Sequence, residues 1–108
     1  MTKETKLSKE IRLWCGQNNW LVWHCNVGGG KLENGSYFST GLPKGFPDLL
    51  ILTDKGQAIF CECKVHPNKP TQDQINFINI LKMRGFNAFV AYTLEEFIEN
   101  ATNNRQNS

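Results

Sequence analysis

Three ionisable residues, Asp48, Glu62 and Lys64, have types and spacings that could hydrolyse a phosphate ester. Two carboxylates held within about 5 Å of each other on one face of a sheet repel each other. A divalent cation between them removes that cost and uses both as hard oxygen ligands. A neighbouring lysine could hold a water molecule or stabilise negative charge that develops on a phosphate. These residue types therefore indicate metal-assisted hydrolysis, provided that the fold brings them together.

Two predicted strands, 48–53 and 58–65, would position these residues. Both are rich in aliphatic and β-branched residues, and an Asp-Lys-Gly triplet between them predicts a three-residue hairpin loop. If the residues that flank this loop pair with each other, Asp48 lies opposite Glu62. Side chains alternate along a strand, so Lys64 shares the face of Glu62, about 7 Å further on. A slip of one residue in the pairing would move Asp48 off this face.

A simpler interpretation of the same residues is an ordinary ion pair on a solvated sheet face. A Glu-x-Lys triplet occurs easily by chance, and Asp48 could merely cap the edge of its strand. The metal site becomes the favoured interpretation because the sequence distance from Pro47-Asp48 to Glu62 fits a hairpin, which would place Asp48 and Glu62 on the same face. In a strand covered on both sides, such charges are costly unless they are paired or bound to a ligand.

The other predicted elements place this hairpin inside an α/β sandwich in which helices flank a mixed sheet, in the order α-β-(long loop)-β-β-α-β-α. The second helix should turn Ile75, Ile78 and Leu81 inward, and Thr93 with Glu96 should form a capping box at the last helix. The remaining expected elements are a helix over about 4–17, a strand over 20–25, a helix from its cap Thr71 to about Arg84, a strand over 86–92 and a short last helix.

The long loop, 28–45, contains six glycines but lacks the spacing of a phosphate-binding P-loop. Loops of this length in small domains are usually functional or disordered. We expect a substrate-facing loop that carries Lys31, Tyr37 and Lys44.

Length and charge indicate one small domain over residues 1–102, with 103–108 as a disordered tail. Residues 1–84 carry eleven Lys or Arg against seven Asp or Glu, a net charge of +4, and the remainder carries −2. A modest positive field suits a polyanionic partner, although an ordinary solvated surface explains the charge equally well. The chain contains no apolar segment near the roughly 20 residues of a membrane span and no secretory signal. We therefore expect a cytoplasmic protein with no membrane partner.

The four cysteines are expected to be free thiols, because the compartment is reducing and no disulfide framework is evident. A zinc site at Cys61, Cys63 and His66 is disfavoured, because the thiols should point away from Glu62 and a fourth ligand is missing. A thiol nucleophile at His24-Cys25 is equally disfavoured, since adjacent strand residues point to opposite faces.

The ordered set of motifs resembles the PD-(D/E)xK nucleases. Gly45-Phe46-Pro47-Asp48 is followed, after thirteen residues, by Glu62-Cys63-Lys64. The helix that follows opens with Thr71-Gln72-Asp73-Gln74, which is similar to the Thr/Ser-x-x-Gln pattern of the virus-type replication-repair nuclease (VRR-NUC) branch. The resemblance covers roughly residues 7–95.

This resemblance implies a restriction-endonuclease-like fold and an Mg²⁺- or Mn²⁺-dependent site. Asp48 and Glu62 would bind the metal, with the backbone carbonyl of Cys63 as a further ligand. Lys64 would orient or activate the attacking water. The implied acidic residue of the first helix would be Glu10, which could instead be a solvated helix residue. Gln74 matches the glutamine that follows the core motif in this family, and this role is compatible with a capping box at Thr71. Cys63 stands where the family usually has an aliphatic residue between the Glu and the Lys, which is a mild departure.

The function implied is an endonuclease that hydrolyses DNA phosphodiester bonds during DNA repair, acting as a homodimer on branched DNA as Holliday-junction resolvases do. One alternative is an RNA or single-strand nuclease with the same site, because no residue here identifies a contact to a 2′-hydroxyl. Another is a nucleic-acid-binding module without turnover. By resemblance, the chain could be phage-encoded and act in the host cytoplasm.

Overall fold

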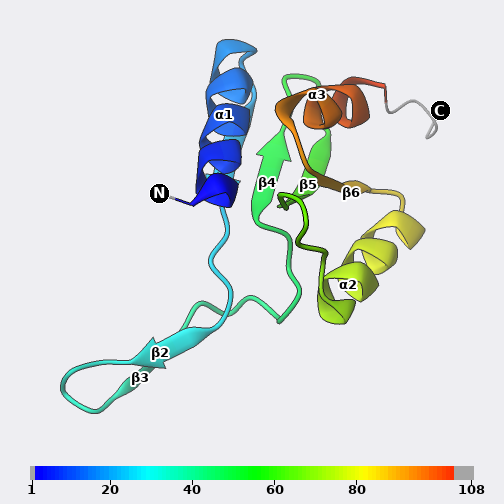
Figure 1. Cartoon of the computed structure of the whole chain (residues 1–108). Coiled ribbons are helices and arrows are strands. Elements are labelled where there is room, and N and C mark those ends of the chain that lie inside the picture. Colours follow the sequence, from blue (N-terminus) through cyan, green and yellow to red (C-terminus); the bar gives the residue numbers. More distant parts are fainter. Residues whose placement is uncertain (1, 104–108) are drawn as a thin grey trace.

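The computed structural model describes residues 2–103 and contains a four-stranded sheet flanked by helices, with a separate two-stranded ribbon (Figure 1). The main sheet has the strand order β1-β4-β5-β6, antiparallel except for the parallel pair of β5 and β6. The predicted mixed α/β architecture is therefore confirmed. The elements are α1 (Lys3–Gln17), β1 (Leu21–His24), β2 (Gly29–Lys31), β3 (Tyr37–Ser39), β4 (Leu49–Leu52), β5 (Ala58–Cys63), α2 (Gln72–Met83), β6 (Asn87–Ala91) and α3 (Leu94–Thr102).

One face of the sheet packs against α1 and α3. Helix α1 presents a stripe of apolar residues at helical spacing, and α3 adds Phe97, which is fully buried. This cluster covers the alternate residues of β4 and β5 that point to the same side. Its fully enclosed members include Leu7, Ile11, Cys15, Leu49, Ile51, Ile59, Cys61, Cys63 and Phe97.

The opposite face of the sheet packs against α2. Ile78 and Leu81 are buried there against Ala88 of β6, as predicted. Ile75, however, is 38% exposed, so the expectation that it points inward was wrong. The polar side chain of Gln74 takes the inward position in this first turn, and Ile75, about 100° further round the helix, is directed away.

The β4–β5 hairpin has the predicted register. Leu49 pairs with Cys61 and Leu52 with Ala58, and the backbone N–H of Thr53 donates to the Gln57 carbonyl at 2.9 Å across the loop. Continuing this pairing by one residue brings Asp48 opposite Glu62. The short loop and the buried faces of both strands explain why this register could be inferred from the sequence.

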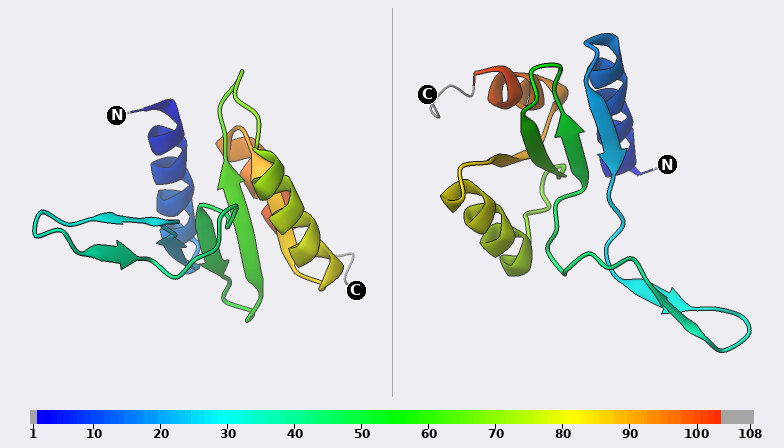
Figure 2. Two further views of the ribbon diagram at one scale, coloured as in Figure 1. Left: turned by 90° about the horizontal axis from the view of Figure 1, so that it is seen from below. Right: turned by 180° about the vertical axis from the view of Figure 1, so that it is seen from behind.

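Residues 28–45 are not a structureless loop, which corrects the sequence prediction. β2 and β3 pair antiparallel from Gly29–Ser39 to Lys31–Tyr37 and form a hairpin that projects from the body of the protein (Figures 1 and 2). Phe38 packs its ring against Gly30, and a Cβ at Gly29 would collide with the Phe38 carbonyl oxygen. Glycine, which weakens a strand by propensity, is here required by the close approach of the two chains.

The last helix begins in a different way from the predicted capping box. The Thr93 hydroxyl accepts from the Glu96 backbone N–H at 3.1 Å, as expected for a cap. The Glu96 carboxylate, however, accepts from the backbone N–H of Tyr92 at 2.8 Å rather than from that of Thr93. The predicted tail, 103–108, lies outside the described residues except for Asn103, which caps α3. Within residues 2–103, no helix is long and apolar enough to cross a membrane.

Candidate active site

Asp48 and Glu62 meet at the end of the β4–β5 hairpin, as the register predicted. Glu62 is 2% exposed, and Asp48 is half-buried just before β4 begins. The backbone N–H of Cys63 donates to Asp48 Oδ2 at 2.9 Å, which holds this carboxylate beside the Glu62 strand. The site therefore begins with two carboxylates from adjacent strands, one of them almost completely excluded from water.

The two oxygens of Glu62 have different surroundings. Oε2 accepts from Gln74 Nε2 at 2.9 Å and lies 3.8 Å from Lys64 Nζ. Oε1 is buried and has no hydrogen-bond partner within the described part of the chain. A buried acceptor without a partner is costly unless a donor or a cation reaches it. One oxygen is thus fixed by protein groups, while the other is left for a ligand.

Burial, and then repulsion from the Asp48 carboxylate, raise the pKa of Glu62 from its usual 4.5 to about 8; Lys64 opposes this shift. A carboxyl group that has lost its water favours the neutral form, and a second carboxylate nearby favours it further. A divalent cation would reverse both effects, because it replaces the missing solvation and screens the two negative charges from each other. The electrostatics of the pair therefore fit a metal site.

The segment before β4 is held against α2 by glycine and aromatic packing. Gly45 has φ of +92°, and a Cβ at this position would collide with the Asp73 backbone carbonyl in the first turn of α2. The Phe46 ring contacts those of Phe60 and Phe77 edge-on, at centroid distances of 6.0 and 5.3 Å. Only glycine permits both the left-handed conformation and this close approach. The Gly-x-Pro-Asp motif thus fixes where Asp48 emerges.

Gln74 has both of the roles considered from the sequence. Its Oε1 accepts from the Thr71 backbone N–H at 2.8 Å, while the Thr71 hydroxyl accepts from the Gln74 N–H at 3.2 Å, which completes a capping box. Its Nε2 donates to Glu62. Both the oxygen and the nitrogen of the Gln74 amide are therefore hydrogen-bonded. The same side chain caps the N-terminus of α2 and orients the Glu62 carboxylate.

A cavity of about 380 Å³ opens beside Asp48. Its walls come from the N-cap and one side of α1, from His24 at the end of β1 and from Cys63 at the end of β5. The lining residues are Thr2, Glu4, Thr5, Ser8, Arg12, His24, Asp48 and Cys63. The positions of Arg12 and Ser8 in this cavity were not predicted from the sequence, and His24 was considered only as the neighbour of Cys25.

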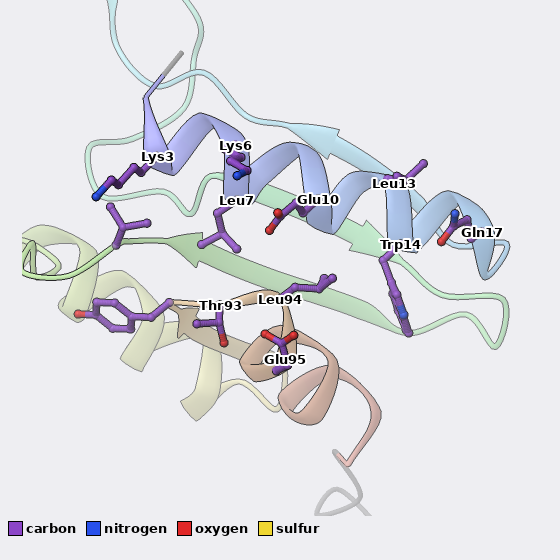
Figure 3. A pocket seen from close by; sticks show the side chains of 12 residues that line it. Lys3, Lys6, Leu7, Glu10, Leu13, Trp14, Gln17, Thr93, Leu94 and Glu95 are labelled. Atoms are coloured by element: carbon purple, nitrogen blue, oxygen red, sulfur yellow. The ribbon is translucent and has the colours of Figure 1, made fainter.

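Glu10 does not reach this cavity. It is exposed and lines a different groove, of about 610 Å³, between α1 and α3 (Figure 3). Glu4 lines the Asp48 cavity instead. Helical spacing in the sequence indicates this difference in direction. Glu4 precedes the buried Ile11 by seven residues and shares its face, whereas Glu10 lies about 100° from Ile11 around the helix.

A divalent cation at Asp48 and Glu62 would need oxygen ligands besides side chains. Among residues 2–103, no three His, Cys, Asp or Glu side chains gather closely enough to hold a metal by themselves. A strand residue directs its N–H and C=O toward the same neighbouring strand, so the carbonyl of Cys63 faces Asp48 as its N–H does. Two carboxylates and a carbonyl, completed by water or phosphate oxygens, are a set that Mg²⁺ accepts.

The cysteines are free thiols in the described chain. Cys61 and Cys63 point into the core that α1 and α3 cover, opposite to Glu62. Burial raises the pKa of Cys61 well above its usual value and that of Cys15 to about 12. Such thiols remain protonated and are poor nucleophiles. The His66 ring stacks on Tyr92 at a centroid distance of 4.2 Å.

Comparisons with known proteins support the fold. No protein-family model matches the chain, and no curated protein matches it either. A solved structure described as a VRR_NUC domain is similar, with a TM-score of 0.71, 97% of this chain and 100% of that chain covered, and 24% sequence identity. This likeness confirms the fold that the motif resemblance implied. A fold hosts many activities, so function depends on the residues that occupy the site.

Proposed function

We propose that this chain is a metal-dependent endonuclease that hydrolyses DNA phosphodiester bonds. The observation that carries the proposal is the buried, unpartnered Oε1 of Glu62 beside the Asp48 carboxylate. Asp48, Glu62 and the Cys63 carbonyl would hold Mg²⁺ or Mn²⁺. When bound there, the metal would supply Lewis-acid stabilisation of the charge that develops on the phosphate.

The protein groups around the carboxylates have complementary roles in this proposal. Lys64 is only partly exposed and lies close to Glu62, so its ammonium group would position the attacking water and stabilise negative charge at the phosphorus. Gln74 would act as a positioning residue, since it contacts Glu62 rather than the substrate. The half-buried Asp48 would be the metal ligand nearest to solvent and to the cavity.

The proposed substrate is structured or branched DNA, cut by a homodimer. A single chain of 108 residues offers one carboxylate site, whereas symmetric cutting of a branched junction needs two facing sites. The positive net charge of residues 1–84 suits a polyanion, and the projecting β2–β3 hairpin extends the surface that could follow a nucleic acid. Motif resemblance supports the preference for branched DNA.

The proposal is tested by cleavage of labelled linear, flapped and four-way DNA, and of single-stranded RNA, in Mg²⁺, Mn²⁺ or EDTA. We expect cutting that requires metal and is fastest on a branched substrate. Glu62→Gln and Lys64→Met should each reduce the rate at least 100-fold. Lys69→Met, an exposed lysine outside the site, is the matched control and should cut normally.

Other outcomes would redirect the assignment. Cutting of RNA or single-stranded DNA in preference to duplex and branched substrates would establish the alternative nuclease with the same site. Binding of DNA by folded wild-type protein without cleavage in either metal would replace the enzyme with a binding module. Sedimentation equilibrium with and without a four-way junction tests the dimer: a monomer in both conditions would overturn that part of the proposal.

A further inference from the structure

A polar stripe on α1 faces the cavity beside Asp48. Thr5, Ser8 and Arg12 are three and four residues apart, so they lie along one side of the helix. All three line the cavity, and His24 lines it from the end of β1. The cavity shares Asp48 and Cys63 with the carboxylate site but does not include Glu62 or Lys64. It is therefore adjacent to the proposed metal site and does not coincide with it.

Two members of this stripe have polar atoms without partners. Ser8 is 5% exposed, and its hydroxyl oxygen makes no hydrogen bond within residues 2–103. The buried Nε of Arg12 also lacks a partner, and no carboxylate in that part of the chain forms an ion pair with this guanidinium group. Buried polar groups are nearly always satisfied in folded proteins. Neighbouring groups left unsatisfied in one cavity therefore point to a ligand.

The chemistry of the cavity wall identifies the class of ligand. Arginine presents several N–H donors in a planar fork and always carries a positive charge, which suits phosphate oxygens. A serine hydroxyl and an imidazole can each donate a further hydrogen bond. Glu4 and Asp48 also line the cavity, but neither forms an ion pair with Arg12. Asp48 accepts from the backbone N–H of Cys63, and Glu4 accepts from the Asn68 side chain. The guanidinium charge is therefore left for a ligand. The wall is therefore suited to an anion with several acceptor oxygens.

We propose that Arg12 and Ser8, with His24 at the edge of the cavity, bind a backbone phosphate of the nucleic acid next to the phosphate that is cleaved. The inference rests on the proposed nuclease function, since the neighbouring carboxylate site determines which phosphate is cut. In this arrangement α1 fixes the register of the strand, and Asp48 connects the two sites. Arg12 is a substrate-binding residue with no part in activating water.

The test is DNA affinity, measured by fluorescence anisotropy of a labelled duplex in Ca²⁺, with cleavage assayed separately. Arg12→Gln should weaken binding about 10-fold or more and reduce the salt dependence of binding by about one counterion. Arg12→Lys should recover part of the affinity, and Ser8→Ala should weaken binding by a few-fold. Lys9→Gln, an exposed α1 lysine with the same charge change, should alter affinity less than 2-fold.

Thermal melting separates ligand binding from a structural role. If Arg12 only supported the fold, Arg12→Gln would lower the melting temperature. A binding role predicts an unchanged or higher melting temperature without DNA, because an uncompensated buried group is removed. Replacing single phosphates by neutral methylphosphonates should reveal one position beside the cut at which wild type loses affinity and Arg12→Gln does not.

The inference fails if Arg12→Gln and Lys9→Gln bind DNA equally well while wild type cuts it. It also fails if Arg12→Gln melts at a lower temperature and every methylphosphonate position affects both proteins alike. If instead wild type binds DNA without cutting it and binding still depends on Arg12, the nuclease proposal fails and a phosphate-binding site remains.

Discussion

The chain contains two antiparallel hairpins that differ in almost every physical respect. The β4–β5 hairpin lies in the middle of the main sheet, packed on both faces, and contains the 2%-exposed Glu62. The β2–β3 hairpin pairs only with itself and projects from the body, and its Tyr37 is 78% exposed (Figure 2). Burial raises the pKa of the Glu62 carboxyl group at the first hairpin, whereas the second hairpin presents its side chains to solvent.

The difference shows what burial contributes to this molecule. A two-stranded ribbon alone is marginal in water and has little to prevent its movement. A hairpin that is covered on both faces holds its polar groups in one geometry and deprives them of water, which strengthens every electrostatic interaction among them. The two hairpins therefore differ in how firmly their polar groups are held and in how much water reaches them.

The largest expected effect compares one acid from each hairpin. Asp48→Asn should reduce the rate of DNA cleavage by about 1,000-fold or more, because it removes the charge of the proposed metal ligand that faces the cavity. Glu33→Gln, an exposed acid in the β2–β3 loop, should leave the rate within 2-fold. Single-turnover cleavage in Mg²⁺ measures both. Comparable losses in the two variants would remove the functional distinction between the hairpins.

The next effect compares two glycines with the same positive φ of +92°. Gly45→Ala should destabilise the protein by about 3 kcal/mol, since it adds a steric collision with the Asp73 carbonyl to the cost of a left-handed conformation. Gly35→Ala, in the β2–β3 loop with open space around it, should cost about 1 kcal/mol. Urea denaturation gives both values. Equal losses would mean that contact with α2 does not hold the segment before β4.

The pH dependence of stability should arise from the buried hairpin. Because the pKa of Glu62 is raised to about 8, the folded protein binds this proton more tightly than the unfolded chain. Its stabilising contribution is complete below about pH 4.5 and is lost as pH rises to about 8, with a slope of at most about 1.4 kcal/mol per pH unit.

Thermal melting in EDTA between pH 5 and 8.5 measures this slope. Glu62→Gln should remove most of it, because the amide does not titrate, and Mg²⁺ should restore the stability of wild type at pH 8 by replacing the proton. Identical slopes for wild type and Glu62→Gln would show that the carboxylate pair is not the source.

Gln74 tests how far the geometry of the buried hairpin depends on α2. Gln74→Ala should lower the cleavage rate about 10-fold, because Glu62 loses its amide donor and can rotate. Gln72→Ala, two residues earlier in the same turn, loses only a surface hydrogen bond to Asn76 and should cut at the rate of wild type. Rates are measured at saturating DNA. An equal rate for both variants would exclude a positioning role for Gln74.

The smallest expected effect concerns the projecting hairpin. Tyr37→Ala should change the free energy of unfolding by less than about 0.5 kcal/mol, because the ring packs on little besides Lys31. DNA affinity should fall by several-fold if the ring stacks on a base or lies along the backbone. Met83→Ala, which is 86% exposed at the end of α2, is the control. Unchanged affinity would show that the ribbon does not contact DNA.

Short-range rules predicted the central hairpin and one helix cap correctly, although the same local spacing wrongly predicted a capping box at Thr93. The Asp-Lys-Gly loop fixed the pairing of β4 with β5, and this pairing alone places Asp48 opposite Glu62. The Thr71–Gln74 capping box followed from local spacing in the same way. Prediction was less successful for the glycine-rich segment, because β2 and β3 have few of the apolar alternations that usually reveal a strand.

Local sequence was enough to define the β4–β5 register, the three helices, the four strands of the main sheet and the placement of Asp48 opposite Glu62, because each depends on residues close together in the chain. The tertiary structure was needed to show that Glu4 rather than Glu10 faces the Asp48 cavity and that Arg12, Ser8 and His24 share it. Those relations depend on the rotation of α1 against the sheet. That rotation is set by the packing of Leu7, Ile11 and Cys15 on strands that follow much later in the chain.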